Sequence, residues 1–322
     1  MRLRLVPEQT NIDFFKYRNA TLGASVVAMI LAVVLWLVMG LNFGIDFKGG
    51  TTIRTQSTQA VDVGAYRNAL QPLNLGDVLI TEVFDPSFGP DQNVAMVRIQ
   101  AQEGQESVSS DTVASVEQAL RALDPNIAFL SVESVGPKVS GELIRTAFLA
   151  VAASLAAILI YIWLRFEWQF SVGAVAALFH DVLLTIGIFS LFQIKFDLAT
   201  IAALLTIIGY SINDTVVIFD RLRENLIKYK QRPLQDVMNL SVNETLSRTL
   251  MTSGTTLIAL TALLVLGGDV IRGFVFAITW GVVVGTYSSV YVAKNIVLFL
   301  GVKRDWTSPG ADKGNQFAKT DA

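Results

Sequence analysis

The sequence is poor in the residues from which disulfides, metal sites and water-soluble surfaces are built. It has no cysteine, which excludes structural disulfides and thiolate metal sites. Its single histidine, His180, excludes a multi-histidine metal cluster. Only 16% of the 322 residues are charged and 52% are hydrophobic, a combination that soluble domains rarely show. The net charge of -2 gives no indication of a nucleic-acid partner.

Long apolar stretches are abundant instead. A membrane-spanning helix needs roughly 20 mostly apolar residues. The stretch that follows the polar, basic segment 1–19 is too long for the apolar core of a signal peptide, so we expect it to be retained as a first span. The sequence predicts an α-helical polytopic membrane protein with a six-helix bundle. The six expected spans are 20–41, 143–164, 170–192, 198–220, 248–267 and 271–300, the last with its membrane part at about 274–295.

Lysine and arginine are concentrated in every second segment outside the predicted spans. Short segments rich in these residues usually lie on the cytoplasmic side of the membrane. The remaining short loops hold only Lys195 and Arg272. The segment 1–19, the loop 221–247 and the tail 301–322 are therefore predicted to be cytoplasmic, and segment 42–140 extracytoplasmic. From about 305 onward the polar composition predicts disorder. The basic residues on the predicted cytoplasmic side are Arg2, Arg4, Lys16, Arg18, Arg165, Arg221, Arg223, Lys228, Lys230, Arg232, Lys303 and Arg304.

Segment 42–140 is polar enough to fold in water. Alternating apolar residues predict strands at 51–56, 78–84, 94–99 and 127–134, and helical spacing predicts helices at 61–71 and about 111–123. Ser109 or Ser110 can cap the second helix. The order βαββαβ is the split pattern of a small α+β, ferredoxin-like domain.

The loop 221–247 has a helical pattern of its own. Pro233 can occupy the first turn of a helix, and Leu234, Val237, Met238 and Val242 then share one face. This pattern fits an amphipathic segment at the cytoplasmic interface or, equally, a plain connecting helix.

Asp214 is the most informative residue, because it lies inside a predicted span. A charge at the bilayer centre costs at least about 2.5–3.5 kcal/mol on insertion scales. Asp214 is roughly 10 Å of helix from Arg221 at the cytoplasmic edge. Tyr210 shares its helix face, and Asn213 and Thr215 add hydrogen-bonding groups beside it.

Arg248 begins the next predicted span and enters from the same side, at a depth similar to that of Asp214. Thr252 and Thr255 share its face and could hold a water chain. Low dielectric favours a neutral carboxylate and a nearby guanidinium favours an ionised one, so movement of the partner can switch protonation. The alternative is a static buried Asp–Arg pair that holds two helices together.

Three further features carry weaker signals. His180 and Asp181 form a second polar locus in a span, although a lone histidine is more often a packing residue. Gly281 and Gly285 have the spacing of a close helix contact, expected within this bundle. The segment 44–50, with Asp46, Gly49 and Gly50, predicts a turn at the membrane edge in which Asp46 is solvated or caps a helix.

Several motifs together resemble the SecF family, in the RND superfamily, nearly from end to end. The most specific are the run from Gly209 to Asn225 and the run from Arg248 to Thr256. The motifs are GIDFKGG at 44–50, VGPKV at 135–139, RFEW at 165–168, HDV at 180–182, GYSINDTVVIFDRLREN at 209–225 and RTLMTSGTT at 248–256.

This resemblance implies a subunit that helps protein export across the bacterial inner membrane with the proton motive force. It implies SecD as a pseudosymmetric partner, association with SecYEG, YajC and YidC, and contact with the translocating preprotein. The resemblance also implies that Asp214 is the carboxylate of the proton pathway, that Arg248 is its partner, and that Asn213 and Thr215 lie beside them. The chain is expected to need no cofactor.

Other functions fit the sequence less well or need a further observation. The sequence has no phosphate-binding loop, no nucleophile–base arrangement and no metal ligands, so an enzyme is not expected. A small-molecule exporter of the RND type would need two six-span halves and much larger extracytoplasmic domains. A structural scaffold for the translocon differs from a proton-driven subunit in whether Asp214 titrates. A carboxylate such as Asp214 with hydroxyl neighbours suits coupling to either protons or sodium ions, and Arg248 as its partner favours protons.

Overall fold

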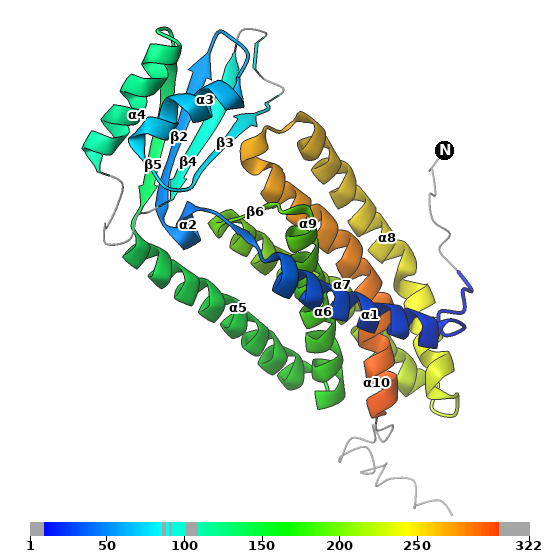
Figure 1. Cartoon of the computed structure of the whole chain (residues 1–322). Coiled ribbons are helices and arrows are strands. Elements are labelled where there is room, and N and C mark those ends of the chain that lie inside the picture. Colours follow the sequence, from blue (N-terminus) through cyan, green and yellow to red (C-terminus); the bar gives the residue numbers. More distant parts are fainter. Residues whose placement is uncertain (1–9, 86–87, 90–91, 101–108, 303–322) are drawn as a thin grey trace, which may run out of the picture.

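The computed structural model describes residues 10–85, 88–89, 92–100 and 109–302 (Figure 1). Six helical segments in this part are long and apolar enough to cross a membrane, which confirms the six-span prediction. Basic residues Arg2, Arg4, Lys303 and Arg304 and the tail from 305 lie outside the described residues. The segments are α1 (Arg18–Met39), α5 (Pro137–Arg165), α6 (Trp168–Phe192), α7 (Leu198–Lys228), α8 (Leu234–Leu266) and Asp269–Leu300.

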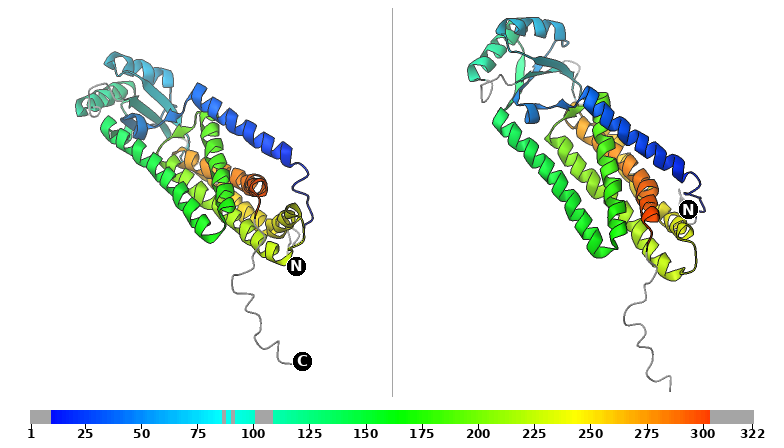
Figure 2. Two further views of the ribbon diagram at one scale, coloured as in Figure 1. Left: turned by 90° about the horizontal axis from the view of Figure 1, so that it is seen from below. Right: turned by 60° about the horizontal axis from the view of Figure 1, so that its bottom comes forward.

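The bundle has an inner and an outer group of helices. Half of the most apolar window of α6 is buried, whereas only 11% of the corresponding window is buried in α1, α5 and α8. The helices α1 and α5 lie at opposite edges of the bundle (Figure 2). The apolar faces that α1, α5 and α8 leave exposed are surfaces that lipid or another membrane helix would cover.

The sixth segment is interrupted by a π-helical turn. It consists of α9 (Asp269–Ser288), the π turn η2 (Ser289–Ala293) and α10 (Lys294–Leu300). A π turn takes one residue more than an α-helical turn and often occurs at functional sites. Immediately after it, the Lys294 side chain is fully buried.

The segment 10–15 is anchored over the end of this helix. Lys294 Nζ donates to the carbonyl of Phe14 (3.3 Å) and lies 5.0 and 4.1 Å from the ring centroids of Phe14 and Phe15. On α8, Asn239 accepts from the Phe14 N–H (2.9 Å), and Asn243 accepts from the Ile12 N–H (2.8 Å). These bonds tie part of the predicted N-terminal segment to α8 and α10.

A small sheet domain sits at one end of the bundle (Figure 1). The strand order is β3-β4-β2-β5, with every neighbouring pair antiparallel, so each helical connection crosses over one intervening strand. The predicted order βαββαβ is present. The elements are β2 (Gly50–Ser57), α3 (Val63–Leu70), the short 3-10 helix η1 (Gln71–Leu73), β3 (Val78–Val83), β4 (Asn93–Gln100), α4 (Ser110–Leu123) and β5 (Ala128–Val135).

The two domain helices are capped as short helices require. Asp62 accepts from the N–H groups of Gly64 and Ala65, and Ser109 accepts from the N–H of Thr112 at 3.1 Å. Ser109 is thus the cap of α4. Apolar side chains from both helices and from the sheet form the domain core, which includes Ile53, Tyr66, Leu70, Val97, Val116 and Leu120.

The junction between domain and bundle is more structured than the predicted turn. Two short strands, β1 (Asn42–Phe43) and β6 (Lys195–Phe196), pair in parallel, and α2 (Ile45–Lys48) follows β1. Gly49 and Gly50 have φ values of 72° and 128°, which side chains rarely allow. Asp46 accepts from the N–H of Leu198 (3.1 Å) and so serves as a cap for α7.

A second junction joins the end of β3 to the start of α9. The Phe84 N–H donates to Asp269 Oδ2 (2.5 Å), and the Asp269 N–H donates to the Phe84 carbonyl (3.1 Å). Arg272 forms an ion pair with Asp269 and lies 5.7 Å from the centroid of the Phe84 ring. We call Phe84, Asp269 and Arg272 the Phe84 clamp.

The predicted loop 221–247 is helical except at 229–233. The helix α7 extends to Lys228, and α8 begins at Leu234 and continues without a break. Val237, Met238 and Val242 are buried against the bundle. The interfacial interpretation is therefore wrong and the connecting-helix alternative is correct, because the apolar face packs on protein.

Gly281 and Gly285 form a close contact within this bundle, as predicted. A Cβ at Gly281 would collide with the side chain of Ile207 on α7, and one at Gly285 would meet Ser211 Cβ at 3.0 Å. The small residues let α7 and α9 approach each other closely.

We expect Gly281→Ala to lower the thermal midpoint of the protein in detergent, because the methyl group has no room beside Ile207. Gly209→Ala is the matched control, since nothing lies within 4 Å of a Cβ there. Alanine favours a helix over glycine by about 0.8–1.0 kcal/mol, so the control should be neutral or stabilising. An unchanged midpoint in Gly281→Ala would contradict the tight contact.

Candidate functional site

The helix α7 places Asp214 on a side that faces α8. The residue is only 4% exposed. Ser253 of α8 lies near its side chain, and the charge of Arg248 acts on it. Its Oδ2 atom has no hydrogen-bond partner in the described part of the chain. A buried carboxylate oxygen without a partner is costly unless the group binds a proton or gains a partner.

Arg248 is exposed on the surface of α8. It interacts with Asp214 through charge, but the described residues contain no ion pair between them within 4.0 Å. The predicted partners therefore share one region of the α7–α8 contact without forming a closed pair. Because Arg248 is exposed, another membrane helix could reach it.

The other residues predicted for the proton pathway are partly buried near Asp214 and partly exposed. Thr215 is buried and its hydroxyl lies 2.8 Å from that of Ser289, on the α9 side of α7. Tyr210 donates to Thr256 at 3.4 Å. Asn213 and Thr255 are exposed. Thr252 donates to carbonyls of its own helix, so its hydroxyl is occupied locally.

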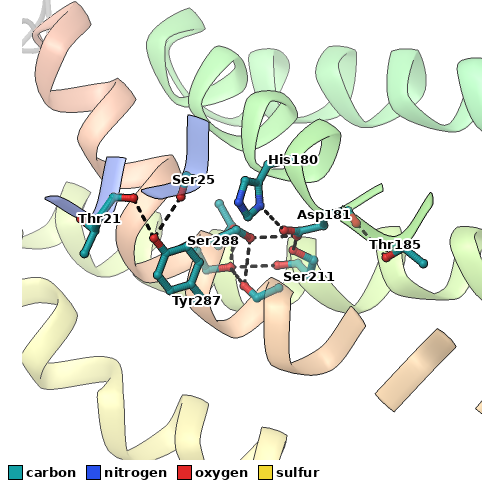
Figure 3. A network of polar contacts seen from close by, with 11 residues as sticks. Thr21, Ser25, His180, Asp181, Thr185, Ser211, Tyr287 and Ser288 are labelled. Carbon is teal, nitrogen blue, oxygen red and sulfur yellow. Dashed lines mark hydrogen bonds and ion pairs between the residues drawn. The ribbon is translucent and has the colours of Figure 1, made fainter. Parts of the chain in front are cut away.

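Asp181 on α6 is the centre of a buried polar network in the bundle (Figure 3). It is fully buried. Its Oδ2 accepts from Ser211 of α7 (2.7 Å) and from Ser288 of α9 (2.8 Å). Its Oδ1 lies 3.0 Å from His180 Nδ1. One carboxylate thus ties together three inner helices.

His180 connects this network toward α1. Its ring stacks on Tyr287 with centroids 6.0 Å apart. The Tyr287 hydroxyl donates to the Thr21 carbonyl (2.9 Å) and lies 3.0 Å from the Ser25 hydroxyl (Figure 3). His180 is 1% exposed, and its Nε2 has no partner among the residues described.

The α9 residues join the two carboxylate regions. Thr286 binds Ser253, the neighbour of Asp214, at 2.7 Å. Ser288, two residues further on, binds Asp181. Sequence reasoning missed the α9 hydroxyls. Four consecutive polar residues, Thr286 to Ser289, in an otherwise apolar span were the available signal.

No group of three or more His, Cys, Asp or Glu side chains with metal-binding geometry occurs among the described residues. The polar groups around Asp181 and Asp214 include carboxylate, imidazole and hydroxyl groups, which can bind and pass protons. Six apolar spans around buried ionisable groups, with a sheet domain at one end, define a polytopic membrane protein whose bundle encloses titratable side chains.

Comparison with known proteins identifies the family. The family model described as "Protein export membrane protein SecD/SecF, C-terminal" matches residues 115–303, and the "SecD/SecF GG Motif" matches residues 34–61. The protein translocase subunit SecF of Cereibacter sphaeroides is 69% identical over 321 residues, which cover 100% of this chain and 99% of that protein. SecF of Rhodobacter capsulatus is 67% identical over 310 residues, covering 94% and 93%. The chain belongs to the SecF family of protein translocase subunits.

Solved structures of SecDF share the fold. The crystal structure of SecDF from Thermus thermophilus matches with a TM-score of 0.81 and 36% identity, over 92% of this chain. SecDF in its super-membrane-facing form matches with a TM-score of 0.67 and 38% identity, also over 92% of this chain. In both cases the match spans only 39% of the SecDF chain.

Proposed function

We propose that this chain is the SecF-type subunit of a protein-export complex in the bacterial inner membrane, with both termini in the cytoplasm, and that it uses the proton motive force. The observation that carries the proposal is Asp214, a buried carboxylate with an unpartnered oxygen on a membrane helix. Family membership supports the role in export. A proton is the simplest ligand for such a carboxylate.

A SecD-type subunit is the proposed partner. The chain corresponds to 39% of the SecDF chains it resembles, so a second bundle is needed to make the whole machine. The exposed apolar faces of α1, α5 and α8 and the exposed Arg248 support a membrane-embedded partner. Membership of the SecF family also supports the Sec translocon and the preprotein as further partners.

Protonation of Asp214 would act through its interaction with Arg248. The ionised carboxylate attracts the guanidinium, and the neutral acid does not. Proton binding and release therefore alternate the force between α7 and α8. One elementary charge that crosses 100 mV is worth about 2.3 kcal/mol, enough to bias a two-state movement substantially.

The helix α9 is the proposed link from the bundle to the sheet domain. It is 20 residues long, or about 30 Å. One end belongs to the Phe84 clamp, and the other end carries Thr286 and Ser288, which contact the two carboxylate regions. A shift of α9 would therefore reach the extracytoplasmic domain directly.

Ion flux through the complex tests this proposal and identifies the ion. The chain is reconstituted with its SecD-type partner, and flux is measured under a proton gradient and, separately, under a sodium gradient. We expect proton flux in the wild type and a fall of about 10²-fold in Asp214→Asn, the lower end of what a positioned proton-transfer group contributes. Flux driven only by sodium, or equal proton flux in both proteins, would overturn proton coupling at Asp214.

A further inference from the structure

The network around Asp181 is not required by a pathway that uses Asp214 alone. Asp181 and His180 are 0% and 1% exposed and lie on α6, whereas Asp214 is on α7. An ionised carboxylate this deep would be costly without strong compensation. Three donors supply that compensation: the hydroxyls of Ser211 and Ser288 and a ring nitrogen of His180.

The hydrogen bonds of Asp181 select one tautomer of His180. Its Oδ2 already accepts two hydroxyl donors, as an ionised carboxylate does. With Asp181 ionised, the contact of 3.0 Å from Oδ1 to His180 Nδ1 places the proton on Nδ1. Nε2 of the neutral ring is left with a free lone pair, buried and without a partner in the described structure. A pinned imidazole with a free basic nitrogen is a proton acceptor.

Several ionisable groups on the elements packed against α6 contact residues other than Asp181. The ring of Tyr287 stacks on His180 and also on Tyr291. Asp214 interacts with Arg248, and Lys294 donates to Phe14. Tyr210 binds Thr256. The other ionisable groups on α1, α5, α7 and α9 are Arg18, Lys138, Glu142, Arg145, Tyr161, Arg165, Asp220, Arg221, Arg223, Glu224, Lys228, Asp269 and Arg272.

The position of His180 also suits proton passage. On one side Asp181 shares the α9 hydroxyl region with the neighbours of Asp214, through Ser288 and Thr286. On the other side the stacked Tyr287 reaches Thr21 and Ser25 near the start of α1. Figure 3 shows His180, Ser211 and Ser288 pointing toward Asp181, and Thr21 and Ser25 beside the Tyr287 hydroxyl.

We infer that His180 and Asp181 form a second proton-binding site within this subunit. The proton binds the lone pair of His180 Nε2, the Nδ1–H bond is kept, and the Asp181 carboxylate offsets the charge of the resulting imidazolium. The inference rests on the proposed proton coupling and adds a site that Asp214 does not supply. The competing role is a static hub in which Asp181 only joins α6, α7 and α9.

Histidine NMR separates these roles, because the chain has one histidine. The complex with the SecD-type partner is labelled with ¹⁵N-histidine, and subtraction of the His180→Gln spectrum isolates the His180 signal. We expect the Nδ1–H tautomer at high pH and reversible conversion to imidazolium as the pH falls. A His180 that stays neutral until the protein unfolds would overturn the inference.

Proton flux provides the second measurement. The side-chain amide in the His180→Gln variant can still donate to Asp181 but cannot take a proton, so a static hub would survive the change. We expect this variant to assemble normally and to lose about 10²-fold in flux, with a changed pH profile. His180→Asn is the replacement if the first variant fails to assemble.

The outcomes distinguish the two proposals. Loss of flux in Asp214→Asn, together with a wild-type pH profile in His180→Gln, would leave the proposed function standing and overturn the second site. Wild-type flux in Asp214→Asn would overturn the proposed function, and the NMR titration would still decide whether His180 binds a proton.

Discussion

Replacing Asp214 with asparagine should reduce export driven by the proton motive force to the level seen without the complex. Asparagine keeps the size and hydrogen-bonding capacity of the side chain but cannot bind and release a proton. Because the carboxylate is only 4% exposed, no water-exposed group nearby can easily take over. The measurement is late-stage preprotein translocation into membrane vesicles, with and without a proton gradient.

Asp220→Asn is the matched control, because Asp220 lies on the same helix but is substantially exposed and pairs with Arg165 at 3.3 Å. Exposed pairs contribute about 0–1 kcal/mol, so this variant should export normally. Wild-type export by Asp214→Asn would favour a structural scaffold. Restoration of export by the exchanged pair Asp214→Arg and Arg248→Asp would favour a static ion pair instead.

Replacing Asp269 with alanine should separate proton flux from export. The alanine variant loses the carboxylate that accepts from the Phe84 N–H and pairs with Arg272. Asp269 is one residue at the start of α9, far along the helix from Thr286 and Ser288, so flux should remain near the wild-type level. We expect most of the proton-dependent stimulation of export to disappear, because the side-chain contacts between the domain and the start of α9 are lost and only the backbone bond from the Asp269 N–H to the Phe84 carbonyl remains.

Asp269→Asn is the informative companion variant. Its amide oxygen can still accept from the Phe84 N–H, although the ion pair with Arg272 is lost. It should therefore retain much of the stimulation that the alanine variant loses. Equal export by the alanine variant and the wild type, measured in the same vesicles as flux, would show that the Phe84 clamp does not transmit movement.

The sequence is sufficient to predict the parts of the fold that depend on local pattern. About 20 apolar residues identify a span whatever its neighbours are, so all six were found. The alternation of side chains in β2, β3, β4 and β5 predicted the domain in the same way. The parallel pairing of β1 with β6 could not be predicted, because it joins residues about 150 positions apart and each strand has only two residues.

The continuity of α8 was missed for a related reason. An amphipathic pattern at 234–242 does not say whether the apolar face meets lipid or protein. The burial of Val237 and Met238 depends on α7 and on α10, which lie elsewhere in the sequence. Only the tertiary structure distinguishes these two environments.

The candidate site was predictable where one residue was anomalous and not where many ordinary residues converge. Asp214 was found because a carboxylate in an apolar span is costly. Its unpaired arrangement with Arg248 depends on how α7 and α8 are rotated, which the sequence does not specify. The bonds from Ser211 and Ser288 to Asp181 likewise need three helices in contact, and serine in a span is common.

The π turn η2 determines how the side chains of α10 are rotated around the helix axis relative to those of α9. Ser288, just before the turn, contacts Asp181, and Ser289, its first residue, contacts Thr215. Downstream, Lys294 lies against the rings of Phe14 and Phe15. One residue of an α-helix corresponds to about 100° of rotation. The serine contacts before the turn and the lysine contacts after it can therefore form together only if the segment 289–293 keeps its length. The residue types in this segment matter less. Single-residue substitutions there would preserve the rotation between α9 and α10, whereas deletion of any one of the five would turn the buried lysine away from its aromatic neighbours.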